Sequence, residues 1–421
     1  MHRGSVEIGG NCVEFDAADG RRLVVDVGRP LWASRDDVVE LPAEVAGTDV
    51  SASTLCGVVI SHPHLDHYGL ADQLAPDVPV YIGREAASLL AAAAFFSPMT
   101  TAVNPTGYLA HGVPLEVGPF TVTPLLNDHS AFDAYSLVIG ADGQRVFYTG
   151  DIRAHGRKRT LFEQLLASPP ADVDVMLMEG THVRADAAHD DADFETEDEL
   201  ERRLVGIVRD TPGAVALVGS AQNIDRLVTA YRAAKRTGRE LVVDLYGASV
   251  AAATRASIPQ LGFPGLRVYV PHRQRVLVKG SGEFDRVRQL GAARVYHEEL
   301  AASPERFVYH VPSSVVHELI GREALRSPGL VLWSMWTGYL RDASGKRLEQ
   351  RVRSAGLGFE TLHTSGHASV KDLRRLVDAV KPTTLVPMHS EATDRFEELF
   401  PRVERHADGE WWSVEASATS R

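Results

Sequence analysis

Four potential metal ligands lie within six residues in the segment His-Pro-His-Leu-Asp-His, residues 62–67. Neutral imidazoles and carboxylates suit Zn²⁺ and similar divalent ions. His62 and His64 are two residues apart, so in an extended segment their side chains project from the same side of the backbone. Because four such groups cannot comfortably share one tetrahedral site, we expect two neighbouring metal ions. The alternative is a polar surface loop that is merely rich in histidine.

The elements that would position these groups are predicted strands. Residues 58–60 are all β-branched and predict a short buried strand that ends at the segment. A strand over 121–126 leads to His129, and a strand over 145–148 leads to Asp151. An open catalytic site takes three protein ligands per ion, so His129 is a candidate third ligand rather than an isolated polar histidine. Asp151 can bridge two cations with its two carboxylate oxygens, and its alternative role is a helix cap.

Further acid–base groups follow predicted strands towards the C-terminus. The strands are expected over 174–178, 358–362 and 384–386, and they precede Glu179, His367 and His389 respectively. The carboxyl ends of strands are where sites in α/β proteins assemble, so these groups could join the same centre. Asp26 ends an N-terminal strand near the same edge, where it either closes a tight turn or supports a metal ligand.

The composition is typical of a globular protein with ample core. A chain of 421 residues suits two or three domains, and 44% of its residues are apolar. Two cysteines without a CxxC spacing indicate a reducing compartment, and we expect a cytoplasmic protein. The N-terminus lacks the apolar core of a signal peptide, and the most apolar run, 86–96, is too short to cross a membrane. The net charge of −12 argues against non-specific coating of nucleic acid but does not exclude a nuclease.

The chain changes character in its middle third. Residues 184–201 are strongly acidic and are expected to form an exposed linker that leads into a helix. Strand-like and helix-like segments then alternate over 190–355. Alternation of this kind predicts parallel strands with crossover helices, and therefore an inserted α/β domain.

The segment at 62–67 resembles the HxHxDH signature of the metallo-β-lactamase superfamily, which implies an αββα sandwich with a dinuclear metal site at one edge of its two sheets. Glu179, the Ser-Gly-His-Ala segment at 365–368 and the Pro-Met-His-Ser-Glu segment at 387–391 resemble motifs A, B and C of the β-CASP nucleases. Residues 219–226 resemble a segment of ribonuclease J. The resemblance covers nearly the whole chain.

The resemblance implies an α/β fold in three stretches. Residues 1–190 and 358–421 would form the metallo-β-lactamase domain, and 191–357 the β-CASP insert. The chain departs from the ribonuclease J pattern at Gly180, Asp225 and Ser390, and nothing follows Arg421, so we expect a short form without the usual C-terminal domain.

The resemblance also implies roles for single residues. One metal would be held by His62, His64 and His129, the second by Asp66, His67 and His389, with Asp151 between them. The predicted catalytic residues are Asp66, Glu179 and His367. Of these, His367 would protonate the leaving oxygen, oriented by Glu179, or else serve only as a structural histidine. The predicted contacts to phosphate or substrate are Gln222, Asn223, Ser365, Gly366 and Ala368. Candidate aromatic residues for stacking on bases are Trp333, Trp336 and Tyr339, with core packing as their alternative.

The resulting hypothesis is a nuclease that hydrolyses phosphodiester bonds of single-stranded nucleic acid, with RNA favoured over DNA. Two divalent ions are expected, with Zn²⁺ preferred and Mn²⁺ or Mg²⁺ as alternatives. We expect no membrane partner, and a homodimer is one arrangement that the sequence allows. The alternative functions are a DNA nuclease of repair or defence and a small-molecule hydrolase of esters or thioesters. A binding protein with a decayed site is a weaker hypothesis, because no metal ligand is missing.

Overall fold

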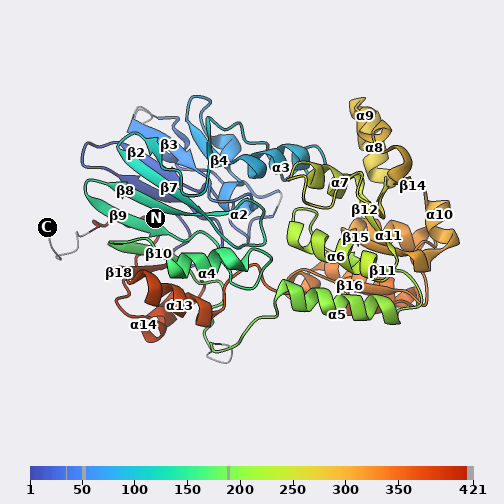
Figure 1. Cartoon of the computed structure of the whole chain (residues 1–421). Helices are drawn as coiled ribbons and strands as arrows, with labels where there is room; N and C mark the ends of the chain where they lie inside the picture. Colours follow the sequence, from blue (N-terminus) through green and yellow to red (C-terminus); the bar gives the residue numbers. More distant parts are fainter. Residues whose placement is uncertain (35, 50–53, 187–189, 415–421) are drawn as a thin grey trace. The chain divides into compact units, whose positions relative to one another are not determined.

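The computed structural model describes residues 1–34, 36–49, 54–186 and 190–414 (Figure 1). The chain divides into two compact units, and each is described here by itself. The first unit contains residues 1–194 and 366–421, and the second contains residues 195–365. The sequence predicts domain boundaries at 190/191 and 357/358.

Two sheets form the centre of the first unit. The five-stranded sheet has the order β1 (Val13–Asp16), β2 (Arg22–Val25), β3 (Leu55–Val59), β4 (Val80–Gly83), β5 (Gly107–Leu109). The six-stranded sheet has the order β18 (Thr384–Met388), β10 (Val175–Glu179), β9 (Gln144–Tyr148), β8 (Tyr135–Ala141), β7 (Phe120–Leu126), β6 (Leu115–Val117). The strands β9, β10 and β18 are parallel, so their carboxyl ends lie at one edge of the sheet.

Apolar side chains on the inner faces of both sheets form one core. Its members include Leu23, Val25, Val59, Val122, Leu137, Leu177 and Val386. The side chains of β10 alternate, with Val175 and Leu177 in this core and Met176 and Met178 in a second core on the other face. A strand that is buried on both faces needs a continuous apolar sequence, and β10 has one.

Helices cover the outer faces of the two sheets. The second core lies between the six-stranded sheet and three helices, namely α4 (Arg159–Ala167), α13 (Val370–Val380) and α14 (Phe396–Leu399) (Figure 1). The helix α3 (Arg84–Ala94) contacts β4 of the other sheet and buries Leu89 and Leu90 completely. The layers are therefore helix, sheet, sheet and helix, which confirms the predicted α/β class and its αββα arrangement.

The second unit is built on a seven-stranded parallel sheet. Its order is β14 (Arg294–Val295), β13 (Leu266–Tyr269), β12 (Glu240–Asp244), β15 (Phe307–Val311), β11 (Val215–Val218), β16 (Leu330–Trp333), β17 (Gly358–Thr361). Its longer helices are α5 (Glu197–Asp210), α6 (Ile224–Arg236), α7 (Leu245–Ala252), α8 (His272–Ser281), α11 (Ser313–Gly321) and α12 (Ala343–Ser354). The edge strand β17 pairs with β16, which explains why this unit ends after the boundary that the sequence had suggested.

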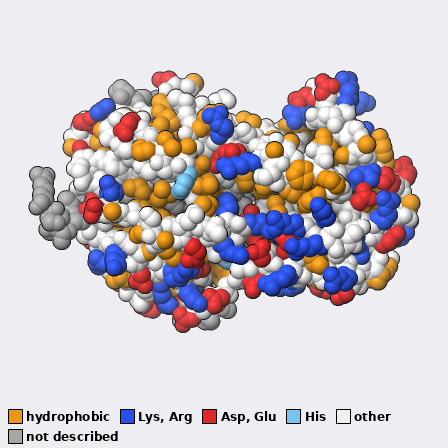
Figure 2. Space-filling model, in the orientation of Figure 1, with side chains coloured by type: hydrophobic (Ala, Val, Ile, Leu, Met, Phe, Trp, Pro, Cys, Tyr) orange, Lys and Arg blue, Asp and Glu red, His pale blue; other side chains and the backbone are white. Residues whose placement is uncertain are grey.

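The surface of the second unit carries mixed charge over α5 and α6. Figure 2 shows basic and acidic side chains next to one another on this face. Glu201 of α5 forms ion pairs with Arg232 and Arg236 of α6, with N–O distances of 3.6 and 2.6 Å. Much of the positive charge here is therefore already neutralised. Among the helices that the structure describes, none combines the length and apolar character needed to cross a lipid bilayer.

Candidate metal centre

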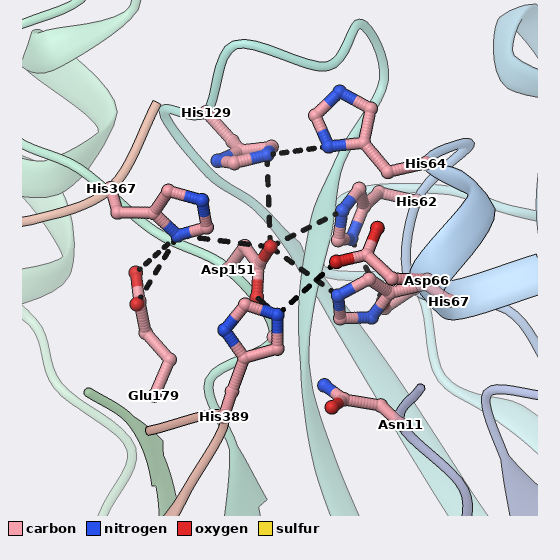
Figure 3. Close-up of polar contacts among 12 residues, drawn as sticks. Asn11, His62, His64, Asp66, His67, His129, Asp151, Glu179, His367 and His389 are labelled. Carbon is pink, nitrogen blue, oxygen red and sulfur yellow. Dashed lines mark hydrogen bonds and ion pairs between the residues drawn. The ribbon is translucent and has the colours of Figure 1, made fainter. Parts of the chain in front are cut away.

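The predicted ligands of the first unit meet where several of its strands end (Figure 3). The segment at 62–67 follows β3, and its last residues enter the short helix α2 (Leu65–Tyr68). His129 follows β7, Asp151 follows β9 and His389 follows β18. Because β9, β10 and β18 run parallel, the side chains after them are brought to the same edge of the sheet.

One group of potential ligands consists of three histidines and a carboxylate, and its ligand atoms all lie within 4.8 Å of one another. His62 Nε2 is 3.6 Å from Asp151 Oδ2, and His129 Nε2 is 3.9 Å from the same oxygen. His64 Nδ1 lies 3.2 Å from His129 Nε2. Three imidazoles facing one carboxylate oxygen form a donor set that suits a zinc-type ion.

A second group shares Asp151 and contains Asp66, His67 and His389. His67 Nε2 is 3.3 Å from Asp151 Oδ2, and His389 Nε2 is 3.3 Å from Asp66 Oδ2. The other oxygen of Asp151, Oδ1, lies 3.8 Å from His389 Nε2. Asp151 thus belongs to both groups.

The buried polar atoms of the centre fit a divalent cation. His62 Nε2, His67 Nε2 and both carboxylate oxygens of Asp151 are buried and have no hydrogen-bond partner among the residues described. A buried polar atom without a partner costs free energy, so several that face one point fit a bound cation. All of them are atoms that coordinate metals. The residues therefore fit divalent metal ions.

The protonation states of the first group, His62, His64, His129 and Asp151, also suit metal binding. Burial lowers the pKa of His62 and His129 well below the usual value, and it lowers the pKa of His64 to about 4. Burial alone would raise the pKa of Asp151, but His389 and His67 hold it well below its usual range. Neutral imidazoles and an ionised carboxylate are the forms that bind a cation.

A buried hydrogen-bond network fixes the orientation of His67. Its Nδ1–H donates to Asp26 Oδ2 at 2.7 Å, which leaves Nε2 to face the centre. The same oxygen accepts hydrogen bonds from the hydroxyls of Tyr148 (2.6 Å) and Ser61 (2.8 Å), while Oδ1 accepts the amide of Ser61. Asp26 has a φ of 60° and is fully buried. Two roles were considered for Asp26, a tight turn and support of a metal ligand. The structure shows a contact with the candidate ligand His67 in addition to the turn.

Glu179 and His367 lie beside the two groups. His367 Nδ1 is 3.2 Å from Glu179 Oε2 and 3.8 Å from Asp151 Oδ2. Burial alone would lower the pKa of His367, but the carboxylates of Glu179 and Asp151 raise it to about 9. The His367 side chain is 20% exposed, whereas that of Glu179 is 1% exposed. The imidazolium is therefore both favoured and accessible.

Thr181 is a contact that was not singled out from the sequence. Its Oγ1 lies 3.1 Å from His367 Nδ1 and 2.9 Å from His389 Nδ1. Because Nε2 of His389 faces Asp66, we assign the proton of this ring to Nδ1, which then donates to Thr181. Its position two residues after Glu179, in the same strand-end loop, is the signal that could have identified it.

Two of the predicted phosphate contacts, Gly366 and Ala368, lie in the first unit. A Cβ on Gly366 would lie 2.5 Å from Ser130 Oγ and 3.4 Å from His129 Cε1, so a larger residue here would require Ser130 to move. The amide of Ala368 donates to the Ile152 carbonyl at 2.6 Å. Its predicted contact with phosphate stays a prediction.

The other three predicted substrate contacts belong to the second unit. Gln222 donates to the hydroxyl of Tyr246 at 2.9 Å, and Asn223 accepts the amide of Arg226 at the start of α6. Ser365 is the last residue of that unit. Their role in binding substrate stays a prediction. Of the three aromatic candidates, Trp333 is buried, as core packing requires, while Trp336 and Tyr339 are about half exposed.

The family of the chain follows from comparison with known proteins. The model of the beta-lactamase superfamily domain matches residues 22–218, and the model of the Zn-dependent metallo-hydrolase RNA specificity domain matches residues 357–409. Residues 22–218 therefore form a domain of the metallo-β-lactamase superfamily. The two matched segments include all seven candidate metal ligands.

Individual relatives agree with the resemblance to ribonuclease J. Ribonuclease J of Sinorhizobium meliloti is 24% identical over 87% of this chain and 65% of its own length. Ribonuclease J of Pyrococcus abyssi is 24% identical over 92% of this chain and 88% of its own, and that of Mycobacterium tuberculosis is 26% identical over 91% and 67%. The chain thus spans just under two thirds of the length of the Sinorhizobium protein.

A solved structure shares the fold of the whole chain. A protein of unknown function from Enterococcus faecalis superposes with a TM-score of 0.76, covers 97% of this chain and 98% of its own, and is 20% identical. At this identity the likeness concerns the fold alone.

Proposed function

We propose that this metallo-β-lactamase superfamily protein is a nuclease that hydrolyses phosphodiester bonds of single-stranded RNA. The observation that carries the proposal is the shared carboxylate of Asp151 between two ligand groups, with the His367 and Glu179 pair beside it. The match to an RNA specificity domain and the ribonuclease J relatives support RNA as the substrate class. We further propose that the second unit is the β-CASP insert, as the sequence predicted for 191–357.

Two ions, preferably Zn²⁺, would be held by the two groups of side chains. The histidine-rich donor set supports zinc, with Mn²⁺ and Mg²⁺ as the alternatives. The first ion would have His62, His64 and His129 as ligands, and the second Asp66, His67 and His389, with Asp151 shared. Divalent ions in such sites supply positive charge against the phosphate and make water more acidic.

The remaining chemistry belongs to side chains of the chain itself. Hydrolysis leaves an alkoxide on the departing nucleotide, which needs a proton. We assign that proton to His367, whose imidazolium is favoured by Glu179 and whose ring reaches solvent. Glu179 orients the ring through Nδ1, so the proton leaves from Nε2. Gly366 keeps the backbone close to His129, where a side chain would meet Ser130.

The proposal is tested by incubating the purified protein with Zn²⁺ or Mn²⁺ and end-labelled single-stranded RNA or DNA of the same sequence. We expect metal-dependent shortening of the RNA and slower or no cleavage of the DNA. Asp151→Asn, which removes charge from both ligand groups, should abolish cleavage. Faster cleavage of DNA would reassign the protein to the DNA nucleases. Hydrolysis of a thioester panel with both nucleic acids intact would contradict the proposal.

A further inference from the structure

An exposed tryptophan lies next to the second ligand group, in a turn that was not singled out from the sequence. Gly9 and Pro30 form an isolated antiparallel β-bridge, and Pro30 immediately precedes the turn that contains Trp32. A Cβ placed on Gly9 would lie 2.8 Å from Leu31 Cγ and 3.0 Å from Asp66 Oδ2. The side chains of Leu31 and of the candidate ligand Asp66 therefore flank the same glycine, and Trp32 is the next residue of the turn.

The indole of Trp32 lies near the Glu7 carboxylate, and most of its surface is open. Trp32 Nε1–H, the only donor of its side chain, is close enough to favour the ionised form of Glu7, and Glu7 is close enough to His389 for their charges to interact. Trp32 is nevertheless 68% exposed, and Leu31 beside it is 54% exposed. Core packing therefore does not explain this ring.

The backbone of the turn is held in place from both sides. The amide of Arg29 donates to the Leu65 carbonyl at 2.9 Å, beside the ligand segment. The guanidinium of Arg29 donates to the carbonyl of Asp37 at 2.7 Å and also to that of Ser34, which closes the loop around it. Within the turn, the amide of Ala33 donates to the Pro30 carbonyl. Trp32 is thus displayed on a fixed backbone next to Asp66.

We propose that Trp32 is a stacking platform for one nucleobase of the single-stranded substrate, on the Asp66 side of the scissile phosphate. This inference rests on the proposed function. Every base has a flat π face, so an exposed indole binds bases with little regard to sequence, and each stacked base adds appreciably to affinity. Because hydrogen bonds hold the backbone of the turn, less conformational freedom is lost when a base stacks on the ring.

The experiment combines a protein variant with a missing base. A set of RNA oligonucleotides, each with one abasic residue at a successive position around the cleaved bond, is assayed with wild-type protein and with Trp32→Ala. With wild-type protein, loss of one particular base should raise KM roughly 5- to 150-fold. With Trp32→Ala, the intact RNA should show a comparable rise in KM, and the same abasic residue should add less than about twofold, because the partner is already absent.

Two further variants test whether an aromatic ring at this place is what matters. Trp32→Phe retains a stacking face and should restore most of the affinity. Trp411→Ala removes another tryptophan of the first unit with similar exposure, 60%, which contacts the ring of His2. It should leave both KM and the abasic profile as in wild type. Equal abasic profiles for wild type and Trp32→Ala would overturn the inference.

The design separates this inference from the proposed function. If wild-type protein cleaves RNA but shows no position that depends on Trp32, the nuclease proposal stands and the stacking platform is refuted. If wild-type protein cleaves no nucleic acid, the nuclease proposal fails. In that case the dissociation constants of the abasic oligonucleotides are measured by fluorescence anisotropy with wild-type protein and with Trp32→Ala. A base-dependent loss of affinity in Trp32→Ala would still support stacking, whereas its absence would refute it.

Discussion

Replacement of Asp26 by asparagine tests how the second ligand group is held. In the wild-type protein, Asp26 Oδ2 accepts three hydrogen bonds, from His67, Tyr148 and Ser61. An asparagine that keeps its oxygen on the Ser61 amide turns its NH₂ group towards His67 Nδ1. Two donors then face each other, so His67 is driven to the tautomer that carries its proton on Nε2, the atom that faces Asp151.

The magnitude follows from this change of tautomer. Loss of a carboxylate that supports a histidine ligand typically weakens metal binding by about 10- to 100-fold. Each lost hydrogen bond to a charged group also costs about 1.5–3 kcal/mol of folding free energy. We therefore expect Asp26→Asn to fold with reduced stability and to bind one of its ions about 10- to 100-fold more weakly.

The assay is competition for metal with a chromogenic chelator of known affinity, accompanied by chemical denaturation. The matched control is Tyr148→Phe, which removes one hydrogen bond to the same carboxylate and leaves the contact between His67 and Asp26. It should lower stability by about 1.5–3 kcal/mol and alter metal affinity by less than about threefold. If Asp26→Asn and Tyr148→Phe bind both ions with equal affinity, the orienting role of Asp26 is refuted.

Three other predictions use different observations. His367→Ala should lower kcat for RNA cleavage by about 10²- to 10⁴-fold with metal content unchanged; an unchanged kcat would show that another group supplies the proton. Burial raises the pKa of Asp244 to about 6, so its proton is bound more tightly in the folded chain, and this stabilisation is present at pH 4 and lost as the pH rises through 6. Wild-type protein should thus lose about 3 kcal/mol of unfolding free energy relative to Asp244→Asn between pH 4 and pH 7, measured by urea denaturation; parallel curves would contradict the buried carboxyl. Removal of metal by a chelator should lower the thermal midpoint, and free Zn²⁺ at 100 times its dissociation constant should restore about 2.7 kcal/mol; a midpoint that is insensitive to both would argue against ions bound in the folded state.

The position of the ligands could be predicted because they follow strands whose type is plain in the sequence. The apolar strands that lead to Glu179 and to His389 are parallel neighbours in one sheet, so they end at the same edge. The β-branched run before residues 62–67 belongs to the other sheet, and the ligands that follow it join the same centre. The fold class follows from the same alternation of strands and helices. These inferences need only the local pattern of apolar and polar residues and the direction of the strands.

Other features depend on contacts between distant segments and could not be predicted in this way. Asp26 meets His67 across 41 positions, and its φ of 60° is not visible in the residue type. The strand β17 has three exposed residues and one half-buried residue, so its pattern does not reveal that it joins the seven-stranded sheet of the second unit. The hydrogen bond of the Ala368 amide is accepted by Ile152, which is far away in the sequence.

The central claim is that Asp151 is shared by two metal ions in one centre. The most direct measurement is the number of zinc ions per chain, by plasma emission spectrometry after equilibration with Zn²⁺ and gel filtration, for wild type and His389→Ala. The account predicts two ions per wild-type chain and one in the variant, which retains the three histidines of the first group. One ion or none in the wild-type protein, or two in the variant, would contradict it.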